Sequence, residues 1–265
     1  MLNLIVADLY KLRKSAALKI SLAITFLSAA AITATAYFLA EGQISLEASG
    51  NAALLMDLVM MSIIGALVAG VFICGDFEHK TIHDAISSGT GRGAVLVSKA
   101  IVYFLAVAVL VLPYPLITAV AAGTGYAFAA PFAPSVFLQI LADRSGVALT
   151  APALGKMLAI ALTMIAVHAA RLSICVLLAF VMRKPALVTG IGVAATILGD
   201  LAVGFHEKIP VLGAVFLYTP FAMNHTVVSM NAGAGDLLKA ITVSLVFIAA
   251  VLAMTYGAFR RAEIK

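Results

Sequence analysis

Long runs without a charged residue constrain this chain more than any other feature. Lys19 and Glu41 enclose 21 uncharged residues, and Asp57 and Asp76 enclose 18. A helix needs about 20 apolar residues to cross the hydrocarbon core of a bilayer. Only 11% of the residues are charged and the mean hydropathy is +1.13, whereas about a quarter of a soluble domain is charged. We therefore expect a polytopic membrane protein rather than a cytosolic enzyme, a disordered chain or a disulfide scaffold.

The remaining uncharged runs complete the prediction of the fold. Lipid cannot satisfy open backbone groups, and no segment alternates as a barrel strand does, so the spans are predicted to be helices. We expect an all-α bundle that forms a single domain over residues 1–265, without internal repeats. Six membrane-spanning helices are predicted, near residues 20–40, 57–75, 100–122, 156–182, 185–204 and 238–259.

The distribution of positive charge predicts the orientation of these spans. With the N-terminus inside, twelve of the 17 Lys and Arg residues fall on the cytoplasmic side and four on the outer side, and Arg171 lies within a span. Cytoplasmic loops carry an excess of Lys and Arg, so both termini are predicted to be cytoplasmic. The net charge of +5 then reflects orientation. Since no basic groove with interleaved aromatic residues is present, no nucleic-acid partner is expected.

The N-terminal segment, residues 1–19, is predicted to hold an amphipathic helix in the inner headgroup region. Leu2, Val6 and Leu9 fall on one helical face, together with Ile5 and Leu12, while Asp8, Lys11 and Lys14 fall on the other. A plain cytoplasmic lead-in to the first span is the alternative. The tripeptide at 34–36 resembles a signal-peptidase site, but the uncharged run continues to Ala40, so we expect this span to be retained.

The loop between spans two and three carries most of the polarity that is predicted to face the cytoplasm. Residues 75–99 read GDFEHKTIHDAISSGTGRGAVLVSK. Phe77 precedes a small apolar stripe of Ile82, Ala85 and Ile86, and Asp76 is placed to cap the start of a helix. We expect a short amphipathic helix that a soluble partner can push. A solvated connector is the alternative.

Motifs for catalysis, nucleotide binding or metal binding are missing. The nearest approach to a P-loop, GAVLVSKA at 93–100, has Ser98 in place of a glycine and Ala100 in place of Ser or Thr. His79 and His83 have a spacing that can hold a metal, but a solvated face is the preferred interpretation. Cys74 and Cys175 both fall within spans, so no disulfide is expected.

The loop resembles that of ABC-2 type permeases, the membrane subunits of bacterial ATP-driven exporters. The family pattern is matched in order by Asp76, Phe77, Thr81, Ile82, Ile86, Gly89, Arg92, Ser98 and Lys99, and the chain departs from it at Lys80, where glycine is usual. The resemblance extends to the amphipathic start LNLIVADLYKLRKS, the six spans and the basic ending FRRAEIK.

This resemblance implies a bacterial cytoplasmic membrane protein that works as a dimer of permease copies with a separate ATPase. The ATPase binds ATP and Mg²⁺, so the chain itself carries no cofactor and is not an enzyme. A coupling helix is implied within 76–88, with the coupling residues Asp76, Phe77, Glu78, Thr81, Ile82, Ile86 and Arg92.

Two charges are predicted to lie deep in the bilayer. Arg171 is 11 residues from Met182, about 17 Å along a helix, and a central Arg costs about 2.5–3.5 kcal/mol. We predict that it pairs with Asp200, with His168 one turn from Arg171, and the pair is either structural or part of a substrate pathway. Asp57 is expected at the outer interface.

Two further features concern the outer half of the chain. Pro113 and Pro115 are predicted to kink the third span, and the apolar segments 123–155 and 205–237 are expected to form re-entrant or interfacial helices. The function predicted from all of these features is export of an amphiphilic substrate, such as an antimicrobial peptide, a drug or a lipid. An ion-coupled transporter or channel is the alternative, and an intramembrane enzyme that uses His168 or the His79/His83 pair is a third reading.

Overall fold

A computed structural model describes residues 2–130, 135–144, 149–203, 216–226 and 228–262. Every regular element in these ranges is helical. Six of the helices are long and apolar enough to cross a membrane, the architecture of a helical polytopic membrane protein. The prediction of six spanning helices is therefore confirmed. Their bounds are Ala16–Ala40, Asp57–Glu78, Arg92–Gly123, Ala151–Met182, Pro185–Ala202 and Ala234–Arg261.

Several spans are built from more than one helical segment. The first span, α2 (Ala16–Ala40), follows the N-terminal helix α1 (Leu2–Lys14). The second contains α4 (Asp57–Ala69), the π-helical turn η2 (Gly70–Cys74) and α5 (Gly75–Glu78), and the third contains α7 (Arg92–Val111) and α8 (Pro113–Gly123). The last three are α10 (Ala151–Met182), α11 (Pro185–Val203) and α14 (Ala234–Arg261). The short helices are α3 (Leu46–Ser49), η1 (Gly50–Leu55), α6 (Thr81–Ser87), α9 (Val136–Asp143) and α13 (Met223–Thr226).

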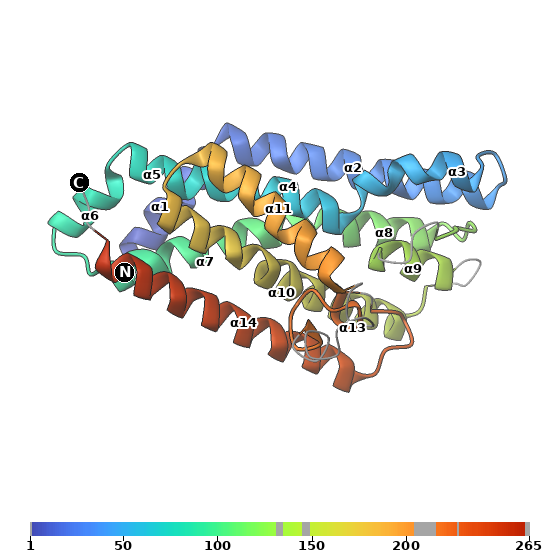
Figure 1. Ribbon diagram of the computed structural model, residues 1–265. Coiled ribbons are helices and arrows are strands. Elements are labelled where there is room, and N and C mark those ends of the chain that lie inside the picture. The colour runs from blue at the N-terminus through green and yellow to red at the C-terminus, as the bar shows by residue number, and fades with distance from the viewer. Residues whose placement is uncertain (1, 131–134, 145–148, 204–215, 227, 263–265) are drawn as a thin grey trace.

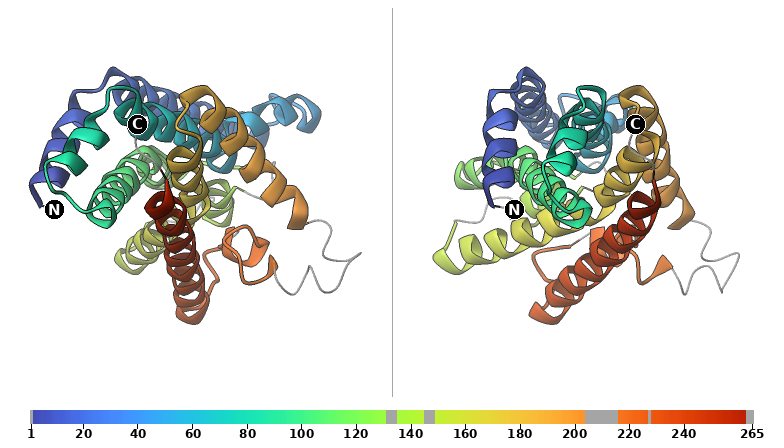
Figure 2. Two further views of the ribbon diagram at one scale, coloured as in Figure 1. Left: turned by 60° about the vertical axis from the view of Figure 1, so that its left-hand side comes forward. Right: turned by 90° about the vertical axis from the view of Figure 1, so that its left-hand side faces the viewer.

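Helix α10 is the centre of the bundle. It packs against α4, α7, α11 and α14, and it buries residues along its whole length, from Ala153 to Phe180. The helices α2, α11 and α14 lie at the periphery, as Figures 1 and 2 show. These three helices expose large apolar side chains such as Leu27, Leu198 and Leu245. Such side chains suit contact with lipid, because the bilayer core is itself apolar.

The bundle has two distinct ends. The near end holds α1, α5, α6 and the C-terminal part of α14, while α3, α9 and α13 lie toward the opposite, far end (Figure 1). The view onto the near end shows α1 beside α6 and α7 (Figure 2). An even number of spans brings the N-terminal and C-terminal helices to the same end.

Proline interrupts the third span where the sequence predicts it. Helix α7 ends at Val111 and α8 begins at Pro113. Pro113 and Pro115 carry no backbone N–H, so the carbonyl groups of Val109 and Val111 lack their usual helical donors. After α8, the segment 123–155 contains α9, which buries Phe137 and Ile140 and packs on α8.

The predicted re-entrant segment 205–237 is described only in part. Residues 204–215 and 227 lie outside the described residues. The described part contains α13 and the first turn of α14, which begins at Ala234, four residues before its predicted start.

A close approach between the second and fifth spans depends on Gly70. This residue opens the π turn η2, and a Cβ placed on it would lie 2.9 Å from the carbonyl oxygen of Pro185 and 3.0 Å from Thr189 Oγ1. The carbonyl belongs to the backbone, so it cannot move aside as a side chain does. The absence of a side chain at Gly70 therefore lets α11 begin directly against the second span.

The substitution Gly70→Ala is expected to destabilise the protein by about 1–3 kcal/mol, because it forces these two backbones apart. Gly190→Ala in α11 is the matched control, since nothing lies within 4 Å of its Cβ position. The control should be neutral or stabilising, as alanine is the better helix former. Both are measured by the thermal unfolding midpoint in detergent, reported by thiol labelling of the buried Cys74 and Cys175. A Gly70→Ala midpoint equal to that of the wild type would contradict this account.

Candidate functional site

Four charged side chains meet at the near end of the bundle. Lys99 Nζ of α7 donates to Asp8 Oδ1 of α1 at 2.5 Å and also to Asp76 Oδ2 of α5. Lys11 Nζ of α1 donates to the other oxygen of Asp76. We call Asp8, Lys11, Asp76 and Lys99 the near-end charge cluster. It joins three helices that are far apart in the sequence.

The near-end charge cluster matters for stability because Lys99 and Asp76 are buried. Lys99 is 4% exposed and Asp76 1% exposed, and a buried charge left without a partner is strongly destabilising. Hydroxyl groups add to the pairing: Ser98 Oγ donates to Asp8 Oδ2 at 3.2 Å, and Thr81 Oγ1 donates to Asp76 Oδ1 at 2.9 Å. The ammonium of Lys99 also lies 4.9 Å from the ring centroid of Phe72. Removing Lys99 would leave Asp8 without a charged partner, and removing Asp76 would leave Lys11 without one.

Two predictions about these residues are wrong. Asp8 was expected on the polar, outward side of α1, but it is 7% exposed and faces the bundle together with Leu12. In this inward position it pairs with the buried Lys99. Asp76 was expected to cap a helix. Instead, it lies within α5 and its carboxylate accepts from side chains.

The loop that follows Asp76 is anchored by aromatic residues. The Phe77 ring lies edge-on to Phe180 of α10, at 5.5 Å between centroids, and to Phe259 of α14, at 6.2 Å. Arg92 Nη1 donates to the carbonyl oxygens of Phe259, Arg260 and Ala262 at 2.7–2.9 Å. A cation at these last carbonyls satisfies the C-terminus of α14 and complements its dipole.

The short helix α6 is present within the range predicted for the coupling helix. Ile82 is its buried anchor and Ile86 is half-buried, while Glu78, His79, Lys80, His83 and Asp84 are exposed. Lys80 has a left-handed φ of 58°, which costs a non-glycine residue about 1–2 kcal/mol. This is the position at which the resembling family usually carries glycine.

The structure therefore separates the seven predicted coupling residues into two groups. Asp76, Phe77, Ile82, Ile86 and Arg92 hold the loop to the spans. Glu78 and Thr81 are exposed, although the Thr81 hydroxyl donates to Asp76. His79 and His83 lie on either side of the turn at Lys80, and no group of three metal-ligating side chains occurs in the described part of the chain.

A second set of charges lies within the spans. Arg171 Nη2 donates to Asp200 Oδ2 at 2.5 Å, so the two residues predicted to pair are in direct contact between α10 and α11. The Arg171 guanidinium also lies 5.2 Å from the ring centroid of Phe221. Arg171 is 1% exposed, whereas the side chain of Asp200 is 36% exposed.

Asp57, which is expected at the outer interface, is the first residue of the second span and belongs to the same set of contacts. It is 1% exposed in the first turn of α4, and its Oδ2 lies 3.3 Å from His168 Nε2. We call Asp57, His168, Arg171 and Asp200 the embedded charge cluster. Within this cluster, Asp57 Oδ1 and Arg171 Nη1 are buried without a hydrogen-bond partner in the described part of the chain.

Sequence reasoning missed the roles of Asp8, Lys99 and Asp57, although each left a signal. Asp8 lies one turn from Leu4 and one turn from Leu12, on the face that docks. Lys99 and Asp57 are single charges flanked by apolar residues, in LVSKAIV and LLMDLVM. A lone charge within an apolar stripe indicates an inward-facing partner, because a charge is rarely buried unless it is paired.

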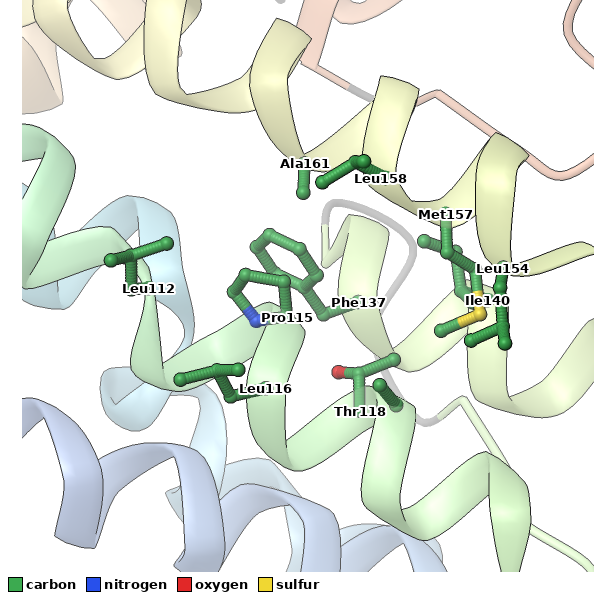
Figure 3. A pocket seen from close by; sticks show the side chains of 11 residues that line it. Leu112, Pro115, Leu116, Thr118, Phe137, Ile140, Leu154, Met157, Leu158 and Ala161 are labelled. Carbon is green, nitrogen blue, oxygen red and sulfur yellow. The ribbon is translucent and has the colours of Figure 1, made fainter.

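An apolar pocket of about 230 Å³ lies between the third span, α9 and α10. Figure 3 shows Pro115 and Phe137 facing Leu158 and Ala161 across it. Thr118 supplies a hydroxyl, and no titratable side chain lines the pocket. It suits an apolar group and offers no acid–base chemistry.

Comparison with known proteins adds no assignment, because no family model, no curated protein and no solved structure matches the chain.

The pairing of Arg171 with Asp200 predicts an asymmetric response to mutation. Asp200→Asn leaves the fully buried Arg171 without its counter-ion, and breaking a buried pair costs about 3–5 kcal/mol. Arg171→Met should cost less, because Asp200 is partly exposed. The double variant should unfold closer to the wild type than Asp200→Asn does.

The test is the thermal unfolding midpoint of the wild type, the two single variants and the double variant. The exposed Lys239→Gln is the control, and its midpoint should equal that of the wild type. Additive losses in the double variant would show that the two side chains do not interact.

Proposed function

We propose that this chain is the permease subunit of an ABC-2 type exporter in the cytoplasmic membrane of a bacterium. It works with a second permease copy and with a separate ATPase subunit, which binds ATP and Mg²⁺. The substrate is amphiphilic, such as an antimicrobial peptide, a drug or a lipid. The sequence resemblance in the loop, the amphipathic start and the basic ending support this proposal.

The observation that carries the proposal is the way the α5–α6 loop is attached. Helix α5 continues the second span, and the loop is fixed to the other spans by Phe77, which contacts α10 and α14. Ile82 is buried, and the outer face of α6 presents exposed polar residues. A partner that presses on this outer face would move several spans together.

The charge distribution supports a cytoplasmic near end. Lys11, Lys80, Arg92 and Arg183 come from the helices and turns of the near end, and α14 ends there with Arg260 and Arg261. The positive-inside rule places such an end in the cytoplasm, where an ATPase finds its nucleotide. The segment 93–100 is part of helix α7, so it does not form the loop that cradles phosphate in nucleotide-binding proteins.

An ion-coupled transporter is the second candidate, and the embedded charge cluster favours it. Its four ionisable side chains come from α4, α10 and α11. Ionisable residues within membrane spans mark ion paths and proton relays in many transporters. The sequence points to Arg171 and Asp200, with His168 one turn from Arg171, and the contact between His168 and Asp57 supports a larger ionisable set.

Cross-linking from α6 tests the proposal. Ser87→Cys puts a reactive thiol on the exposed face of α6, and the natural cysteines are buried. In native membranes, the variant should cross-link to an ATPase with nucleotide-binding motifs. Thr124→Cys, which is exposed at the end of α8, is the matched control and should not.

Transport by the purified chain in liposomes is the second test of the proposal. Without the ATPase it should not transport, and with the ATPase its transport should require Mg-ATP. Uptake by the chain alone, driven by a proton gradient and abolished by Asp57→Asn, would contradict the proposal and support the ion-coupled transporter.

A further inference from the structure

A pocket of about 240 Å³ lies at the near end between α1, α6 and α7. Its walls are apolar and are formed by Leu4, Ala7, Ile82, Ala85 and Val95. All four members of the near-end charge cluster line it as well. The pocket therefore combines an apolar wall with a charged floor, and it lies beside helix α1.

The charged floor has both hydrogen-bond donors and hydrogen-bond acceptors that remain unused. An ammonium has three donors, and a carboxylate has about four acceptor sites. Lys11 uses one donor on Asp76, and its side chain is 48% exposed. Asp8 accepts one hydrogen bond at each oxygen, from Lys99 and from Ser98. Lys11 and Asp8 are three residues apart on one helix, so their Cβ atoms lie about 5–6 Å apart.

A smaller groove of about 50 Å³, which also has Lys11 in its lining, lies between α1 and the first two spans. It is lined by Leu12, Leu18, Val68, Val71 and Phe72, with Ser15 and Ala17. The outward face of α1 is also apolar, because Leu2, Val6 and Leu9 are exposed. Lys11 thus lies between a charged pocket and an apolar groove. A phospholipid crosses the same kind of boundary, because its headgroup is polar and its acyl chains are apolar.

We propose that the near-end pocket binds the headgroup of a phosphatidylethanolamine-type lipid. Its phosphate accepts hydrogen bonds from Lys11, its primary ammonium donates to Asp8, and its glycerol and upper acyl region enter the apolar groove. The inference is independent of the proposed exporter function, because it requires only that the chain lies in a bilayer.

Charge and hydrogen bonding select this headgroup over others. The cluster holds two carboxylates and two ammonium groups, so a zwitterion enters without changing its net charge. An anionic phospholipid would add an uncompensated negative charge beside Asp8 and Asp76. A choline headgroup has the same charge as ethanolamine but no N–H to donate.

Binding is tested with the full chain in detergent, by native mass spectrometry and by the unfolding midpoint. The added lipids are phosphatidylethanolamine, phosphatidylcholine and phosphatidylglycerol with identical acyl chains. The ethanolamine lipid should bind about tenfold more tightly than the choline lipid, the value of one charge-assisted hydrogen bond. Equal binding of these two lipids, or tighter binding of the glycerol lipid, would overturn the proposal.

Two variants locate the site. Ala7→Phe fills the pocket from an exposed position and removes none of the charged side chains, so it should fold and lose the preference for ethanolamine. Lys14→Gln, on the same helix but outside the pocket, should keep it. A preference that survives Ala7→Phe, or that is lost in Lys14→Gln, would place the lipid elsewhere. Soluble phosphoethanolamine should give no comparable shift at equal concentration, and an equal shift would overturn a lipid ligand.

Discussion

The ammonium group of Lys99 holds together parts of the chain that nothing in the local sequence connects. A buried charge is tolerated only when it is paired, because the protein interior solvates it poorly. Lys99 meets this requirement with Asp8 from α1 and Asp76 from α5. The pairing docks the N-terminal helix on α7 and fixes the start of the α5–α6 loop. The near end therefore behaves as one unit rather than as three separate segments.

The second span links this unit to the charges within the bundle. Asp57 lies at its first residue and Asp76 near its last turn, and the π turn η2 lies between them. Single π turns inside α-helices are frequent at functional sites. Gly70 brings the same turn against the beginning of α11, the helix that carries Asp200. One continuous span thus connects the near-end charge cluster, the fifth helix and the embedded charge cluster.

The sequence predicts the scaffold better than the site. Uncharged runs reveal the six spans because lipid imposes a length, and the cost of burying Arg171 points to Asp200. The pairs Asp8–Lys99 and Asp57–His168 join residues 91 and 111 positions apart, and only tertiary packing brings them together. Asp8 was assigned to the polar face of α1 because charge alone was taken to indicate exposure. The same packing turns Arg92 into a cap for α14, which no local pattern indicates.

Hydrogen exchange of a Lys99→Met variant tests most directly whether the near end is a single unit. The substitution leaves Asp8 and Asp76 buried without their shared partner. Amide exchange should then accelerate together in α1 and in residues 75–87, while α11 keeps its wild-type rate. The exposed Lys19→Met variant should leave all three segments unchanged. Faster exchange in only α1 or only the loop would contradict the account, because the two segments would then be held independently.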